Sequence, residues 1–119
     1  MYTQVQSKVV VEFDDSVVSQ AVAMAGGNAV AVEATVFHFN YTGGTSPKLQ
    51  VKVEGSNDLQ NWSNLSTAAP EIAEFDGEGD GEAQVTGIAF GYVRLRLAST
   101  GSPTAGNAIA AAGINVASL

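Results

Sequence analysis

Hydrophobic and polar residues alternate along short segments of this chain, and turn residues separate these segments about every eight to twelve positions. In the clearest segment Leu49, Val51 and Val53 alternate with polar or charged residues, and residues 90–98 repeat the pattern. Strict alternation predicts strands that have one buried and one solvated face. The chain is therefore expected to be built from half-buried strands and not from amphipathic helices.

The other segments expected to form strands have less regular patterns. They cover residues 8–13, 17–24, 29–41, 60–65, 82–88 and 108–117. Alanine has a high helix propensity, so the Val- and Ala-rich segments 17–25 and 108–112 could form helices instead. Such short segments are marginal for a helix and typical of a strand. The expected fold is a single-domain antiparallel β-sandwich over residues 1–119, jelly-roll-like, with eight or nine strands.

Residues 29–41 form the longest expected strand, and both of its faces are largely apolar. By simple alternation one face carries His38 together with a row of valines, and the other carries Phe37, Phe39 and Tyr41. A chain of this size has few apolar loops to cover three adjacent aromatic side chains, each worth about 1.5–3 kcal/mol when buried. The three aromatic residues are therefore predicted to form a contact between identical subunits, in an oligomer of undetermined number.

Composition restricts the chemistry and the partners of the protein. The chain of 119 residues has a net charge of −7 and contains no cysteine. A strongly acidic protein repels phosphate backbones and anionic lipids, which argues against nucleic acid and membrane partners. The absence of cysteine excludes disulfides, thiolate nucleophiles and thiolate metal sites. The N-terminal residues lack the basic and apolar regions of a secretory signal, so the chain is expected to be made and kept in a cytosol, or delivered by lysis or a dedicated machine.

No residue pattern identifies a catalytic site. His38 is the only histidine, and no Gly-x-Ser-x-Gly motif accompanies it. A lone histidine in an aromatic strand is usually structural. Glu12, Glu33 and Glu54 could supply a carboxylate pair for glycoside hydrolysis, but spacing in the sequence cannot place them, and a sandwich of this size rarely offers a deep substrate cleft. The protein is therefore predicted not to be an enzyme.

Carboxylates alternate with glycines over residues 76–82, a pattern that could wrap around Ca²⁺. The weak candidate ligands are Asp76, Glu78 and Asp80. The pattern is incomplete for an EF-hand, because Gly87 stands where a bidentate Glu is required. A solvated acidic hairpin tip is the simpler interpretation, since blocks of like charge are usually exposed. No metal ion or cofactor is assigned to the chain.

Four of the five positive charges are expected on the outward faces of two strands. They are Lys48, Lys52, Arg94 and Arg96. If the two strands are neighbours, these side chains form a cationic patch on an acidic protein. The simplest role of the patch is cross-strand pairing with Glu54 or Glu33, and the second is docking onto an acidic protein surface.

Two stretches resemble segments of known small β-sandwich proteins. Residues 51–62 form a strand, a Ser-Asn-Asp turn and an Asn-Trp return, a hairpin similar to those of discoidin-like carbohydrate-binding modules and of small structural proteins of tailed bacteriophages. Asn57 and Asp58 favour the turn, and Trp62 is expected to fold back onto the core. Residues 90–101 resemble the penultimate strand of such phage proteins.

The phage resemblance implies a non-enzymatic virion structural protein, such as a head decoration or cement protein made in the host cytoplasm. Its partners would be further copies of itself and a capsid protein. The alternative is a carbohydrate-binding module of the discoidin-like type. A sugar site would expose Trp62 or Tyr92 for stacking on a sugar ring, whereas a capsid part would bury them.

Overall fold

The computed structural model describes residues 2–65 and 73–119, and strands are the only regular secondary structure in those ranges. The strands are β1 (Tyr2–Glu12), β2 (Ser16–Val18), β3 (Val22–Ala23), β4 (Ala29–Phe39), β5 (Lys48–Ser56), β6 (Ser63–Asn64), β7 (Ala73–Phe75), β8 (Gly79–Val85), β9 (Tyr92–Thr100) and β10 (Asn107–Ala117). No helix in the described part of the chain could cross a membrane. The expectation of strands in place of helices, including the two alanine-rich segments, is confirmed.

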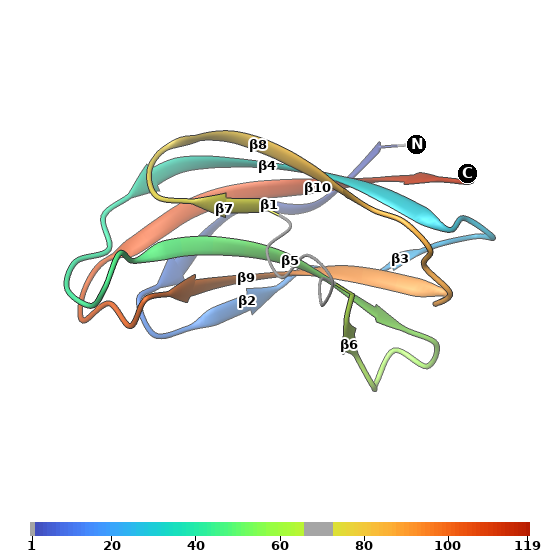
Figure 1. Cartoon of the computed structure of the whole chain (residues 1–119), viewed down its shortest axis with the longest axis horizontal. Helices are drawn as coiled ribbons and strands as arrows, with labels where there is room; N and C mark the ends of the chain where they lie inside the picture. The colour runs from blue at the N-terminus through green and yellow to red at the C-terminus, as the bar shows by residue number, and fades with distance from the viewer. Residues whose placement is uncertain (1, 66–72) are drawn as a thin grey trace.

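The strands form two antiparallel sheets that pack face to face (Figure 1). Sheet A has the order β1-β10-β4-β8, and sheet B has β9 and β5 at its centre with β2 and β3 on one side and β6 and β7 on the other. From β1 onward the chain passes repeatedly between the two sheets, so that most hydrogen-bonded neighbours are distant in the sequence. Two sheets connected in this way are a jelly-roll sandwich, as the alternation pattern predicts.

Ten strands are described where the sequence predicts eight or nine. The difference arises because two positions in sheet B are each shared by two short strands. β2 and β3 both pair with β9, and β6 and β7 both pair with β5. Predicted segment 17–24 is therefore interrupted at residues 19–21. The number of strand positions is the eight of a standard jelly roll.

The core lies between the sheets and is asymmetric in side-chain size. Sheet B contributes large residues, with Leu49 and Leu95 among those that have no exposed surface. The central strand β10 of sheet A contributes mostly alanines to the same core, at positions 108, 110 and 112. The fully buried large aliphatic side chains are Val11, Val30, Val32, Leu49, Val51, Val53, Val93, Leu95, Leu97 and Ile114. Their burial, at about 1.5–3 kcal/mol each, is the main term that stabilises the fold.

A β-bulge in β4 changes which face its aromatic residues occupy. Ala110 of β10 pairs with Val36, whereas the preceding Ile109 pairs with His38, so Phe37 is an extra residue in β4. An extra residue reverses the alternation of every side chain that follows it. Phe37 is 44% exposed on the outer face of sheet A, and His38 shares that face with Ile109.

The prediction that three aromatic residues share one outward face is therefore wrong. Beyond the bulge Phe39 packs against the core and Tyr41 is 6% exposed within it. Their rings meet edge to face with centroids 5.1 Å apart. Of the three aromatic residues expected to face outward, only Phe37 lies at the surface. His38 was expected on the same face as the valines of β4, and it lies on the outer face instead.

The acidic segment also differs from its prediction. The turn at residues 76–78 follows β7, which belongs to sheet B, and leads into β8, which belongs to sheet A. It is thus a crossing between sheets and not a hairpin tip. β8 spans Gly79–Val85, so the strand begins three residues before the predicted segment 82–88 and includes Asp80 and Glu82, whereas Asp76 and Glu78 lie in the turn before it.

Candidate functional site

The outer face of sheet B carries the predicted cations. β5 and β9 are adjacent along their whole length, with Glu54 opposite Arg94 and Lys52 opposite Arg96. Because the intervening valines and leucines face the core, these residues face outward. Trp62, just before β6, lies against the same face. We call Lys52, Glu54, Trp62, Arg94 and Arg96 the cationic face.

Glu54 holds both arginines of the cationic face in fixed positions. The Nε of Arg94 donates to Oε1 of Glu54 at 2.8 Å, and the Nε of Arg96 donates to Oε2 at 2.9 Å. Burial raises the pKa of Glu54, but the hydrogen bonds from Arg96 and Arg94 outweigh it, and the pKa lies below its usual value. Arg96 also donates from Nη1 to the hydroxyl of Ser16 at 2.9 Å. The planar guanidinium groups are therefore ordered before any partner binds.

Trp62 lies on the cationic face, and the prediction that it folds back onto the core is wrong. The guanidinium carbon of Arg94 lies 4.1 Å from the centre of the indole ring. The indole Nε1 donates to the carbonyl of Leu59 at 3.3 Å, which fixes the ring in the turn after β5. The half-buried indole therefore extends the cationic face, in which Glu54 holds Arg94 and Arg96, beyond the edge of β5.

The turn that presents Trp62 is organised by one carboxylate. Oδ1 of Asp58 accepts hydrogen bonds from the backbone N–H groups of Gln60 and Asn61, and Oδ2 accepts one from the Asn61 side chain. These bonds hold the pKa of Asp58 far below its usual value. The buried hydroxyl of Ser56 accepts from two further backbone N–H groups of the turn. The predicted Ser-Asn-Asp turn is thus confirmed, and its rigidity positions Trp62.

The cations of sheet B differ in how far they are neutralised. Lys48 forms an ion pair with Glu74 of β7 at 2.7 Å, at the end of the sheet away from Trp62. Arg94 and Arg96 share the single carboxylate of Glu54, so one negative charge is paired with two positive charges. Lys52 has no ion pair among the described residues. Among the described residues these four cations therefore outnumber the two carboxylates that pair with them, Glu54 and Glu74, on a protein whose net charge is −7.

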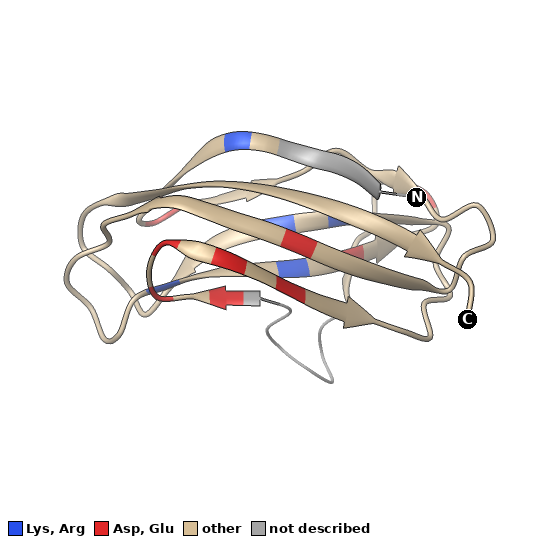
Figure 2. Cartoon of the chain, turned by 90° about the horizontal axis from the view of Figure 1, so that it is seen from above, with Lys and Arg blue, Asp and Glu red and all other residues tan. Residues whose placement is uncertain are grey.

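Two pairing partners were expected for the cations. The predicted pairing with Glu54 is confirmed, and the predicted pairing with Glu33 is wrong. Glu33 lies on β4 in sheet A, directly opposite Glu82 of β8. Asp80 lies on the same face and accepts a hydrogen bond from Thr35 at 2.7 Å. Figure 2 shows these acidic residues along β4 and β8. The two outer faces of the sandwich thus have opposite charge.

The candidate catalytic and metal-binding residues do not converge. His38 is half-buried on the outer face of sheet A, with no hydrogen bond from its ring to another described residue. Glu12 and Glu33 are exposed on sheet A, whereas Glu54 is on the other sheet. Among the described residues no group of three or more acidic or histidine side chains could hold a metal ion, and this includes the calcium candidates Asp76, Glu78 and Asp80.

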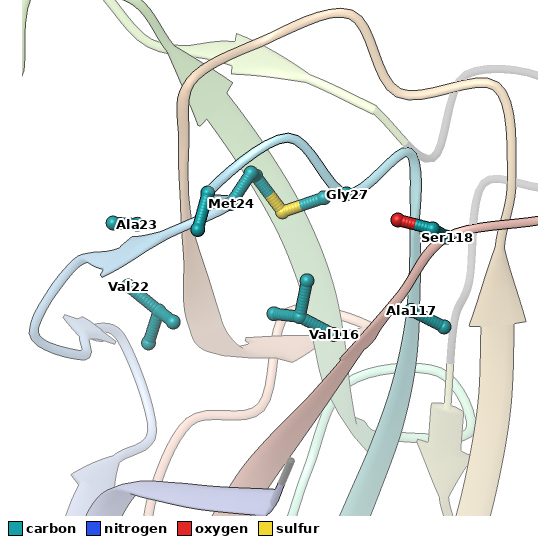
Figure 3. A pocket seen from close by; sticks show the side chains of 8 residues that line it. Val22, Ala23, Met24, Gly27, Val116, Ala117 and Ser118 are labelled. Carbon is teal, nitrogen blue, oxygen red and sulfur yellow. The ribbon is translucent and has the colours of Figure 1, made fainter.

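An apolar pocket of about 270 Å³ lies at one end of the sandwich, between the β3–β4 turn and the end of β10. The side chains of Val22, Met24 and Val116 surround it (Figure 3). The backbone closes around it because Gly27 N–H donates to the carbonyl of Met24 at 2.8 Å. Its lining includes no titratable side chain, so the pocket offers contact with apolar groups and no acid–base chemistry.

No family model and no curated protein matches this chain. Among solved structures, it is similar to Aeromonas hydrophila PliG, a periplasmic inhibitor of g-type lysozyme, at 12% identity and a TM-score of 0.48, over 97% of this chain and 85% of that one. It is also similar to the CBM22-1 xylan-binding domain of Paenibacillus barcinonensis Xyn10C, at 13% identity and a TM-score of 0.48, over 99% of this chain and 86% of that one. Similarity at this level assigns no family.

Proposed function

We propose that this protein is a non-enzymatic structural protein that docks onto an acidic protein surface through its cationic face, as a head decoration protein docks onto a phage capsid. The observation that carries the proposal is the Glu54 carboxylate, which orders Arg94 and Arg96 side by side. Two fixed guanidinium groups can bind carboxylates of a partner at a lower entropic cost than two mobile ones.

The composition of the face supports a protein partner. Arginine and tryptophan are enriched among the residues that contribute most to protein–protein binding, and here they are stacked on each other. The excess of cations would also steer the face toward a negatively charged surface, while the acidic remainder of the molecule opposes other orientations. Residues 51–62 and 90–101 resemble segments of phage structural proteins, and this resemblance supports a capsid protein as the partner.

Carbohydrate binding is the second candidate, and one observation favours it. Trp62 and Tyr92 both remain half-buried at the surface of sheet B, where a sugar ring could stack on one of them. Arg94 already covers one face of the Trp62 ring, which leaves less aromatic surface for a sugar than an open platform would. The arginine arrangement is therefore the stronger of the two observations.

The test is association with virus particles from the strain that carries the gene. Purified protein is mixed with particles lacking it, and the bound fraction is measured by co-sedimentation, with a glycan array run in parallel. Lys52→Glu is the key variant because Lys52 stands outside the Glu54 network, so the folded state is preserved. We expect Lys52→Glu to weaken particle binding about tenfold or more. Particle binding of the unmodified protein and of the variant should also weaken as the salt concentration rises, because salt screens the attraction between exposed charges.

The matched control is Gln84→Glu, which adds a carboxylate to the exposed face of β8 on the opposite sheet. It should leave particle binding unchanged. Equal loss of binding in both variants would contradict docking through the cationic face. Sugar binding without particle association would replace the proposal with the carbohydrate-binding alternative.

A further inference from the structure

Three carboxylates gather on the outer face of sheet A, on the side of the sandwich away from the cationic face. Asp80 and Glu82 lie two residues apart on the edge strand β8, and Glu33 of β4 is directly opposite Glu82. All three side chains are exposed, and none forms an ion pair with another residue that the structure describes. We call Glu33, Asp80 and Glu82 the acidic face.

The acidic face has unneutralised charge around a hollow in the surface. Its three residues, together with Thr35, line an open hollow of about 400 Å³ between β4 and β8. Glu33 and Glu82 are directly opposite each other on paired strands, where like charges repel. Cationic side chains that enter the hollow would remove this repulsion. The acidic face therefore favours a positively charged partner.

The cationic face carries its charges in the same arrangement. Arg94 and Arg96 lie two residues apart on β9, and Lys52 of β5 is directly opposite Arg96. On each face two charged residues are therefore separated by about 7 Å along one strand. The third lies on the neighbouring strand, with its Cβ atom about 5 Å from that of the residue opposite. The two faces thus have matching triangles of opposite charge.

The two triangles also have the relative handedness that contact between the faces requires. β8 and β9 run in opposite directions (Figure 1). β8 lies at the edge of the sandwich where it contacts β7, with β4 inward of it, whereas in sheet B β5 lies between β9 and that edge. Viewed from outside the protein, the three charges therefore turn in opposite senses on the two faces. The triangles coincide when one face is laid on the other after a half-turn about the stacking axis.

We propose that the cationic face of one copy binds the acidic face of a second copy of this chain, so that copies stack in one direction. The pairs formed are Arg94 with Asp80, Arg96 with Glu82, and Lys52 with Glu33. A half-turn combined with a shift along the stacking axis does not close into a ring, so the stack is open-ended. This inference rests on the proposed function, since it uses the same cationic face: a copy docked on a particle presents its acidic face to the next copy.

Charge selects contact between unlike faces over contact between like faces. Two acidic faces repel each other, as do two cationic faces, whereas unlike faces form three pairs of opposite charge. Glu54 already orders Arg94 and Arg96, which lowers the entropic cost of these pairs. The net charge of −7 makes whole copies repel at long range. In about 0.15 M salt the screening length is about 8 Å, so that repulsion is reduced more than the attraction between charges in contact.

The first measurement is analytical ultracentrifugation of the full chain in about 0.15 M salt over a wide range of concentrations. Because the stack is open-ended, the average mass should rise past twice the 12.2 kDa of the chain. A monomer at all concentrations would overturn the proposal. A mass that levels off at the dimer would also overturn it, because a closed pair requires a different interface.

The pair formed by Lys52 and Glu33 tests which faces meet. Lys52→Glu and Glu33→Lys should each weaken association about tenfold or more, because each places two like charges in contact. The double variant Glu33→Lys/Lys52→Glu should recover association. An equimolar mixture of the two single variants should also associate, because each supplies the face that the other lacks. Association that neither single variant weakens would contradict contact between these faces, as would a charge exchange that recovers nothing.

Glu12→Lys is the matched control, because it makes the same change of charge at an exposed position of β1, the other edge strand of sheet A. It should leave association unchanged, and circular dichroism confirms that each variant is folded. Glu33→Lys separates this inference from the proposed function, because it retains the cationic face and should still bind particles by co-sedimentation. Particle binding without self-association of the unmodified protein overturns this inference alone, and self-association without particle binding overturns the proposed function alone.

Discussion

The phenolic hydroxyl of Tyr41 donates a hydrogen bond to the backbone carbonyl of Val11 at 2.8 Å. This bond joins the segment that follows β4 to the edge strand β1, across a separation of thirty residues in the sequence. It exists because the bulge at Phe37 turns Tyr41 into the core. The bond therefore fastens the N-terminal strand to the sandwich.

Replacement of Tyr41 by Phe should lower the free energy of unfolding by about 1–2 kcal/mol. The variant keeps the ring but leaves the buried carbonyl of Val11 without its donor. Urea denaturation of both proteins gives the difference. The control is Tyr92→Phe, because Tyr92 is half-buried on the outer face and should change stability little. Equal effects at the two positions would contradict this role for Tyr41.

The same tyrosine should make the fold sensitive to alkali. Burial, followed by the negative charge of Glu12, raises the pKa of Tyr41 from 10.0 to about 12. The folded state thus retains the proton at pH values where the unfolded state has lost it, so this stabilisation is complete below pH 10 and is lost as the pH rises toward 12. Phenolate absorbance should show Tyr41 titrating late, and Tyr41→Phe should remove that step.

Glu54 should stabilise the protein, in contrast to Glu33. Glu54→Gln removes the charge between Arg94 and Arg96, and we expect a loss of about 1–2 kcal/mol, reduced from the value for a fully buried pair by partial exposure. Because the pKa of Glu54 is lowered, its contribution is present above the ordinary pKa of 4.5 and is lost as the pH falls through the folded-state pKa.

The matched variant for Glu54 is Glu33→Gln on sheet A. Glu33 is directly opposite Glu82, and removal of one of two like charges should leave stability unchanged or increase it slightly. Thermal unfolding of the two variants at neutral pH measures the contrast. A similar loss in both would mean that the arginine pair contributes nothing specific.

Gly27 should be intolerant of any side chain. A Cβ atom at this position would lie 2.6 Å from Cγ1 of Val116 and 3.0 Å from the carbonyl oxygen of Ala117. Gly27→Ala should therefore destabilise the protein by about 1–3 kcal/mol, because β10 must move away from the β3–β4 turn. Gly77→Ala is the control, since a Cβ there has no neighbour within 4 Å. Chemical denaturation of the two variants should show a loss of stability for Gly27→Ala alone.

Local periodicity was sufficient for the parts of the fold in which alternation is unbroken. In β5 and β9 the residues predicted to face inward, such as Val53 and Leu95, have no exposed surface. A period of two fixes which side chains share a face without any knowledge of the neighbouring strand. The sequence alone therefore determined the fold class and the row of cations on the outer face of sheet B.

The tertiary structure decided everything that depends on strand pairing. The bulge at Phe37 is defined by the register of β4 against β10, which lies about seventy residues later in the chain, and it reverses the faces of His38, Phe39 and Tyr41. Likewise, Glu54 and not Glu33 joins the arginines because β5 pairs with β9. Alternation along one strand contains no information about its neighbours, since non-local backbone hydrogen bonds set the register between strands.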